Sequence, residues 1–164
     1  MSILMEKEVT IDRIMSANYD VFKALDDPIR GKIVQLLNKK QLNVKQITRR
    51  LKKFGYKKAV TTIRHHIEIL KESGLIEISK IEESRGAITK YYSSSTKLLD
   101  FTLPLDFDEN YSKLISKTSL KLGKVIGPIL KNFSKTRKIQ QINYNNYIVM
   151  EIVNRAITNL LEKK

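Results

Sequence analysis

The sequence predicts a mostly α-helical fold of the α+β class, in which short helices and a two-stranded hairpin precede two long helices. Three observations predict it. Between residues 28 and 73, apolar residues recur every three or four positions, which is the helical period. Segment 75–81 alternates apolar and polar residues, segment 87–93 carries β-branched and aromatic residues, and residues 82–86 have hairpin-loop composition. Beyond residue 105, two long apolar stripes return at helical spacing.

The first 38 residues contain one weak signal of secondary structure, in residues 1–15, and one strong signal for a helix start, at Asp27 and Pro28. Residues 1–15 alternate loosely and fit either a strand or a lead-in to a helix. Ser16 is expected to cap a short helix with Tyr19, Phe22 and Leu25 on one side. Asp27 before Pro28 marks the start of the next helix, because proline lacks a donor that would be unpaired there. That helix should end near residue 38, with a core face formed by Ile29, Ile33, Leu36 and Leu37.

Two further helices follow, each with a start or stop signal. Asn43 and Gln46 form a capping-box pattern, and Gly55 is placed to end the helix that they open. We expect its core face to consist of Val44, Ile47, Leu51 and Phe54. After a connector, Tyr56 to Lys58, the third helix should run from 59 to 73 and stop at Gly74. Its inward residues are predicted to be Val60, Ile63, Ile67 and Leu70.

A helix-turn-helix followed by a hairpin is the order of a winged helix, here predicted over residues 16–95. The Ser-rich stretch from residue 93 suits a hinge, and residues 105–164 are predicted as a separate helical region. Asp106 and Glu109 open its first helix, and Gly127 with Pro128 should kink or split that helix. The last helix is expected from about residue 137 to 162.

The composition argues against several classes of function. No cysteine is present, which excludes disulfides, thiolate metal sites and cysteine nucleophiles. Adjacent His65 and His66 cannot form a helical metal-binding pair, and no glycine-rich phosphate loop or catalytic carboxylate pair is recognisable. We therefore expect no enzyme activity, no metal and no cofactor. Apolar runs fall short of the ~20 residues of a membrane span. The N-terminus does not resemble a secretory signal, so we expect a cytoplasmic protein.

The basic charge is concentrated where the three short helices lie. The formal net charge is +14, and residues 28–67 contain no Asp or Glu. The basic residues of that stretch are Arg30, Lys32, Lys39, Lys40, Lys45, Arg49, Arg50, Lys52, Lys53, Lys57, Lys58 and Arg64. A folded segment of this composition points to nucleic acid as its partner.

Residues 20–95 resemble ArsR-type winged-helix repressors. The resemblance rests on the segments Ala24 to Arg30, Ile33 to Leu37, Thr61 to Leu70 and Ser73 to Ile76. It implies that the third helix is a recognition helix leading into a wing. The chain departs from the family in two ways: Asn43, Val44 and Lys45 stand where metal-sensing members carry a Cys-x-Cys pair, and the link from Leu51 to Ile63 is longer. Residues 105–164 look more like the dimerisation tails of PadR-type regulators.

The third helix is the candidate base-reading element. Short hydroxyls and an arginine suit the ~12 Å major groove, since arginine can bind guanine with two hydrogen bonds. The predicted outward residues are Thr61, Thr62, Arg64, His65 and Glu68. An ordinary solvated helix face is the alternative interpretation. His66 matches a histidine that recurs in the family, and we interpret it as a packing or phosphate-positioning residue.

Other basic residues are candidates for phosphate contacts, which add affinity without sequence information. The predicted phosphate set is Lys45, Arg49, Lys52, Lys53, Lys57, Lys58 and His66. A wing with Lys80, Arg85 and Lys90 could reach the backbone or minor groove, although Glu82 and Glu83 in the same loop oppose this. A charged but merely solvated face is again the alternative.

The two C-terminal stripes are predicted to bury against each other and against a second copy. The expected homodimer contacts are Leu114, Leu122, Ile126, Ile129, Ile152, Ile157 and Leu160. A two-fold dimer would read a palindromic site. Gly123, Gly127 and Pro128 leave room for a ligand pocket, and the sequence leaves a small-molecule effector open.

Together these features predict a sequence-specific, double-stranded-DNA-binding transcriptional regulator, acting as a homodimeric repressor. One alternative is a sequence-tolerant architectural DNA-binding protein, which the high charge would also suit. A second alternative is a winged helix that binds RNA or protein.

Overall fold

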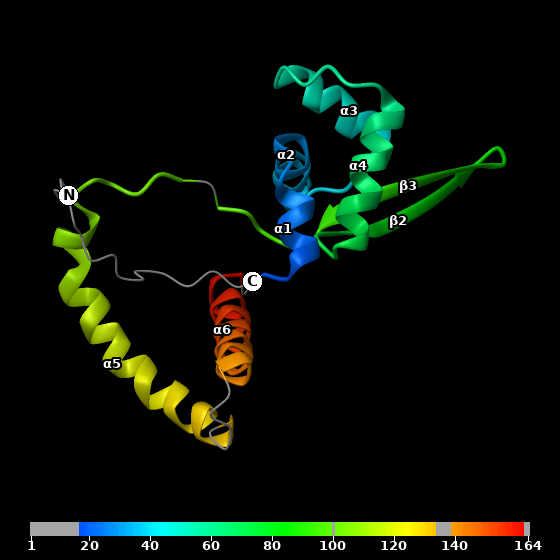
Figure 1. Ribbon diagram of the computed structural model, residues 1–164. Helices are drawn as coiled ribbons and strands as arrows, with labels where there is room; N and C mark the ends of the chain where they lie inside the picture. Colours follow the sequence, from blue (N-terminus) through cyan, green and yellow to red (C-terminus); the bar gives the residue numbers. More distant parts are fainter. Residues whose placement is uncertain (1–16, 100, 134–138, 163–164) are drawn as a thin grey trace, which may run out of the picture. The chain divides into compact units, whose positions relative to one another are not determined.

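The computed structural model describes residues 17–99, 101–133 and 139–162, and of residues 139–141 it describes the backbone only. The chain divides into two compact units, one of which is Ala17–Phe101, while the other contains Thr102–Lys164. Figure 1 shows the elements along the chain. The predicted lead-in, residues 1–15, and Ser16 lie outside the described residues.

The first unit begins with two short helices, α1 (Tyr19–Leu25) and α2 (Pro28–Leu37). Asn18, rather than Ser16, caps α1, because the Val21 N–H donates to Asn18 Oδ1 at 2.9 Å. Tyr19 and Phe22, predicted to share one side of this helix with Leu25, are exposed. The buried face instead consists of Val21, Ala24 and Leu25, three residues at helical spacing that pack against the core.

Helix α2 begins as its sequence predicts. Pro28 is its first residue, and the Ile29 N–H donates to Asp27 Oδ1 at 2.8 Å. The core face differs at one position, since Val34 is fully buried while Leu36 is only half-buried. The helix therefore contributes Ile29, Ile33, Val34 and Leu37 to the core.

Helix α3 (Val44–Lys53) is closed by a hydrogen-bonded capping motif at each end. The predicted capping box is confirmed: the Gln46 N–H donates to Asn43 Oδ1 at 3.0 Å, and the Asn43 N–H donates to Gln46 Oε1 at 2.9 Å. At the other end, Gly55 has φ +87°, and the Tyr56 N–H donates to the Leu51 carbonyl at 3.0 Å. This is a Schellman motif, which favours glycine because the left-handed backbone has no room for a Cβ.

Helix α4 (Val60–Glu72) closes the helix-turn-helix and ends in the same way. Gly74 has φ +74°, and the Leu75 N–H donates to the Leu70 carbonyl at 3.0 Å. Ile63, Ile67 and Leu70 are buried as predicted, but Val60 is 37% exposed. Val60 is the first residue of α4 and precedes the turns of the helix that pack on the core.

The sheet has the order β1-β3-β2, with β1 (Leu42–Asn43), β2 (Ile76–Ser84) and β3 (Ala87–Ser94) all antiparallel. Its hairpin is tighter than predicted, because the strands extend to a two-residue turn, Arg85-Gly86. Both turn residues have positive φ, +51° and +76°, as a type I′ turn requires. The hairpin reaches well beyond α4 in Figure 1. Strand β1 was not predicted, since two residues carry no periodic signal.

One hydrophobic core joins α1–α4 to the base of the sheet. Its fully buried large side chains are Ile33, Val34, Leu37, Ile47, Leu51, Ile63, Ile67, Leu70 and Ile76. These residues come from three helices and β2, so the helix-turn-helix and the wing share one interior. The predicted fold class, a winged helix-turn-helix with further C-terminal helices, is confirmed.

The second unit contains α5 (Phe107–Phe133) and α6 (Ile139–Leu161). Helix α5 continues through Gly127 and Pro128, so of the two expected outcomes, a kink or a split, the split does not occur; proline removes one backbone donor, and the adjoining turns keep the helix intact. No described residue of α5 is buried, and in α6 only Asn145 and Val149 are. None of the described helices is long and apolar enough to cross a membrane.

Candidate nucleic-acid interface

The basic residues predicted on α3 form one exposed face. Lys45, Arg49, Lys52 and Lys53 are exposed, while Ile47, Thr48 and Leu51 anchor the other side of the helix in the core. The spacing of three and four residues explains this division, because such residues are neighbours on a helix surface. Lys57 and Lys58, in the connector between α3 and α4, are exposed as well.

Helix α4 presents most of the predicted base-reading residues on one face. Thr61, Arg64 and His65 are exposed, and Glu68, half-buried, follows at the same helical spacing. The Lys71 ammonium pairs with the Glu68 carboxylate, which neutralises the acid on this face. Thr62 is half-buried and lies off this face, toward His66. Of the predicted set, Thr62 is therefore the residue least available for contact.

A hollow of about 650 Å³ lies where α3, α4 and the wing meet. Its lining includes Lys45 of α3, Arg64 of α4 and Lys90 of β3. The sequence assigned these three side chains to three different roles, and the fold brings them into one concave surface. Asn43 and residues 87–92 complete the lining with Val44. Three cations around one open hollow are suited to the phosphates of a nucleic-acid backbone.

The wing itself carries as many acids as bases. The Lys80 ammonium pairs with Glu82 and lies 5.5 Å from the centre of the Tyr91 ring. The Tyr91 hydroxyl donates to Glu82 Oε2 at 2.7 Å. Hydrogen bonds from Lys80 and Tyr91 hold the pKa of Glu82 below its ordinary value. Lys80 is thus engaged within the wing.

The strand register also separates the predicted wing cations. Lys80 is paired with Tyr91 and Ile81 with Lys90, so Lys80 and Lys90 lie on opposite faces of the hairpin. Arg85 is exposed in the turn at its end. The three residues do not form a single patch.

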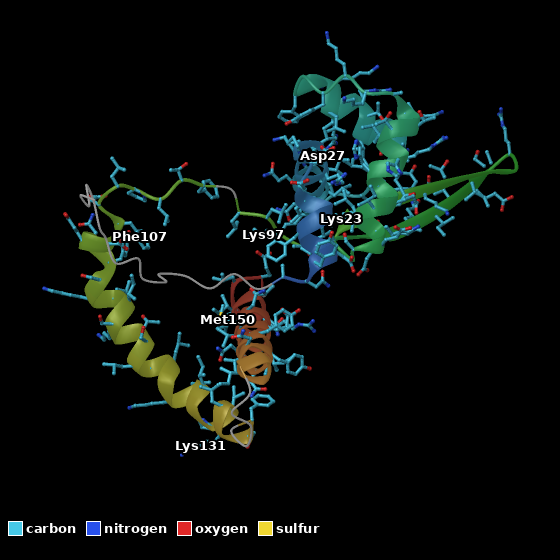
Figure 2. The ribbon with its side chains drawn as sticks, in the orientation of Figure 1. Lys23, Asp27, Lys97, Phe107, Lys131 and Met150 are labelled. Carbon is cyan, nitrogen blue, oxygen red and sulfur yellow. The ribbon has the colours of Figure 1, made fainter. Side chains whose placement is uncertain are left out.

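His66 is placed differently from the rest of the phosphate set. It is only 7% exposed, and its Nδ1 lies 3.9 Å from Asp27 Oδ2 (Asp27 is labelled in Figure 2). Within the described part of the chain, His66 Nδ1 has no hydrogen-bond partner. Burial lowers the pKa of His66, and the Asp27 carboxylate opposes that shift. Of the two roles predicted for His66, packing and phosphate positioning, its burial favours packing.

Arg30 is likewise engaged inside the protein. Its guanidinium donates to the carbonyls of Lys23 (3.0 Å) and Ala24, and lies 3.9 Å from the Asp27 carboxylate. It ties the end of α1 to the start of α2. Arg30 therefore does not belong to the exposed basic surface, although it lies in the acid-free stretch.

Two residues of this surface were missed by the sequence interpretation. Asn43 and Tyr91 both line the hollow, and they are directly opposed in the β1–β3 pairing. They join the wing to the N-terminus of α3. The sequence signal for Asn43 was its cap, whereas Tyr91 is placed by a pairing between distant residues that no local pattern reveals.

The predicted dimer residues lie in the second unit and are largely uncovered. Leu114, Leu122, Ile152, Ile157 and Leu160 are exposed, and Ile126 and Ile129 are half-buried. In the ranges that the structure describes, no group of three acidic or histidine side chains is arranged to hold a metal ion.

The comparisons with known proteins bear on the first unit. The family described as a helix-turn-helix domain matches residues 25–79. A solved structure that this chain matches is the homodimeric winged helix-turn-helix DNA-binding domain of a possible ArsR-family transcriptional regulator from Mycobacterium bovis. It is 20% identical, with a TM-score of 0.36, over 64% of this chain and 81% of that one. No curated relative matches the sequence at a significant level. The match to this family covers α2, α3, α4 and the start of β2.

Proposed function

We propose that this chain is a sequence-specific transcriptional regulator that binds double-stranded DNA as a homodimer and represses by occupying a promoter. The observation that carries the proposal is the hollow where α3, α4 and the wing meet, with Lys45, Arg64 and Lys90 in its lining. The helix-turn-helix family match supports the same conclusion.

In the proposed complex, the exposed face of α4 enters the major groove. Arg64 and the hydroxyl of Thr61 would contact base edges, with His65 beside them. Because Arg64 also borders the hollow, it lies between the base edges and the nearest phosphates. Arg64 is accordingly the residue on which sequence preference should depend most.

The phosphate backbone would follow the basic face of α3 and the connector. Lys45, Arg49, Lys52 and Lys53 lie on that face, and Lys58 approaches from the connector. Each such contact releases counterions, so affinity should fall steeply with salt. The wing would help to orient the protein on the duplex through a contact of Lys90 with the backbone. Because the wing has equal numbers of acids and bases, it would contribute little to the salt dependence of the affinity.

The homodimer is supported by the exposure of α5 and α6. A helix pair held in water with this much apolar surface has little to stabilise it, because tertiary burial supplies most helical stability in proteins. A second copy would cover Leu114 and Ile157 and place two α4 helices on one duplex. Sedimentation equilibrium tests this directly, and a monomer at micromolar concentration would contradict it.

Selection of bound fragments from a random duplex library, followed by footprinting, tests sequence specificity. We expect a palindrome whose half-sites are about one helical turn apart. Arg64→Ala should reduce discrimination among sequences by about 1–3 kcal/mol at the affected base pair. Lys52→Ala should weaken binding to all duplexes and lower the salt slope by about 0.9. Lys113→Ala, which removes an exposed charge from α5, is the control and should change neither quantity.

Two outcomes would contradict this function. If random duplex competes as well as the selected fragment at moderate salt, the chain is a sequence-tolerant architectural protein. If Arg64→Ala weakens binding to RNA as much as to the selected duplex, base reading in the major groove is not its role.

A further inference from the structure

A second hollow, of about 340 Å³, lies in the winged-helix unit between α2 and the residues that follow α3. Its lining consists of Pro28, Gly31, Lys32, Gln35, Phe54 and Tyr56. None of these residues lines the hollow beside the wing. Its volume is at the lower end of the range for small-molecule sites, about 300–1,000 Å³, which suits a ligand of one or two rings.

Gly31 forms the open side of α2 in this hollow. Glycine in a helix interior is unfavourable relative to alanine, because it loses more backbone freedom on folding. A Cβ built on Gly31 would meet no atom within 4 Å in the described parts of the chain. Packing within this unit therefore gives no reason for the glycine. Its effect is to leave the α2 backbone accessible at this position.

The aromatic side of the hollow is held in place by the end of α3. Phe54 is the C-cap residue, and Tyr56 follows Gly55 in the Schellman motif. Tyr56 is half-buried against the core, whereas Phe54 is 54% exposed. Two rings on a hydrogen-bonded turn form a preorganised aromatic wall, which lowers the cost of binding a flat apolar group.

The polar groups of the hollow favour an anion. Lys32 Nζ lies 4.2 Å from the centre of the Phe54 ring and 3.4 Å from Gln35 Oε1. No acidic residue occurs between residues 28 and 67, so the local field is positive. A carboxylate beside Lys32, joined to an aromatic body between Gly31 and Phe54, would satisfy the charge and the shape together.

We propose that this hollow binds a small aromatic carboxylate that acts as an effector of DNA binding. The effector role rests on the proposed function, whereas binding does not. Phe54 and Tyr56 lead through Lys57 and Lys58 into α4, so a ligand that contacts the two rings changes the segment that sets the position of the recognition helix.

Binding is tested on the full-length chain by NMR, with 1-naphthoate as the probe. We expect shifts concentrated at Gly31, Phe54 and Tyr56. The uncharged 1-naphthol and the non-aromatic cyclohexanecarboxylate should each bind about threefold to tenfold more weakly, since one lacks the charge and the other the flat ring. Absence of shifts at these residues at the solubility limit of 1-naphthoate would overturn the proposal.

Gly31→Ala tests the site most directly, because it should change stability and ligand binding in opposite directions. The methyl group should raise Tm by about 4 °C through helix propensity and weaken 1-naphthoate binding about tenfold by occupying the hollow. Gly123→Ala, at another helical glycine with open space around it, should leave 1-naphthoate binding unchanged. Lys32→Gln should weaken 1-naphthoate but not 1-naphthol. Wild-type binding by Gly31→Ala, or a lower Tm, would refute the assignment.

The regulatory step is tested by duplex affinity with and without saturating 1-naphthoate. We expect a change of at least about fivefold, a typical lower bound for coupling between two sites. An unchanged duplex affinity in a chain that binds 1-naphthoate would refute the effector role. Failure to bind duplex both with and without 1-naphthoate would instead refute the proposed function, so the two failures are distinguishable.

Discussion

Acidification should destabilise the winged-helix unit through His66, which lies in the interface between α4 and the start of α2. Its imidazole is buried, with Nδ1 lacking a hydrogen-bond partner in the described structure. Burial lowers its pKa below the ordinary 6.5, and so do Arg30, His65 and Lys58, while the Asp27 carboxylate raises it. The net direction is downward, so folding favours the neutral form of His66 over the protonated form.

The sign of the pH dependence follows from this direction. In the unfolded chain His66 titrates near 6.5, whereas in the folded unit it titrates below that value. Between the two pKa values the unfolded state binds more protons, so the free energy of unfolding falls as the pH falls. The contribution is fully present above pH 6.5 and is lost below it. One proton limits the slope to about 1.4 kcal/mol per pH unit.

Urea unfolding between pH 7.5 and 5.0 at constant ionic strength measures the effect, followed through the NMR methyl signals of Ile33 and Ile67. These two residues report on the winged-helix core alone. The difference between wild type and His66→Gln isolates the histidine from carboxylates that titrate in both proteins. His65→Gln, at the neighbouring exposed position, is the matched control and should reduce the slope only slightly, because burial lowers the pKa of His66 more than His65 does.

One result would refute this reasoning. If the wild type gains stability relative to His66→Gln as the pH falls, the protonated imidazole is stabilised by Asp27 more than burial opposes it. The 3.9 Å separation of Nδ1 and the Asp27 carboxylate would then shorten to a charged hydrogen bond in solution.

Three further substitutions test the fold. Ile67→Ala removes a side chain that is 1% exposed, and it should lower the free energy of unfolding by about 2–5 kcal/mol in urea titrations, whereas a change below 1 kcal/mol would contradict the assigned core. Asn43→Ala deletes the acceptor of the Gln46 N–H and should cost about 1 kcal/mol, seen as faster amide exchange in the first turn of α3. Gly86→Ala forces a Cβ onto a residue at φ +76° and should destabilise the hairpin by about 1–2 kcal/mol, with faster exchange of β2 and β3 amides and no effect on α2.

The sequence predicted those features whose causes are local. Asp27 with Pro28, and Asn43 with Gln46, define helix starts because each side chain reaches a backbone group within three residues. Gly55 and Gly74 define helix ends because only a left-handed residue completes the Schellman hydrogen bonds there. The exposed faces of α3 and α4 followed from helical spacing, once the inward residues were fixed.

The errors arose where a distant part of the chain decides the outcome. Periodicity assigned Phe54 and Val60 to the core, but each stands at a helix terminus and is exposed. A match to a histidine that recurs in ArsR-type regulators placed His66 with the phosphate set, whereas in the fold its side chain is buried and lies 3.9 Å from Asp27. The pairing of Asn43 with Tyr91 joins residues on separate strands and is invisible to any local pattern.

The scarcity of buried residues in α5 and α6 has a consequence for gene dosage. In the proposed homodimer, a newly made chain at low copy number would leave the apolar stripes of its tail in water, open to proteases, until it met another copy. Assembly by mass action makes the amount of paired protein rise with the square of the free chain concentration. The expression level would thus control the amount of DNA-binding dimer steeply, independently of any small-molecule effector.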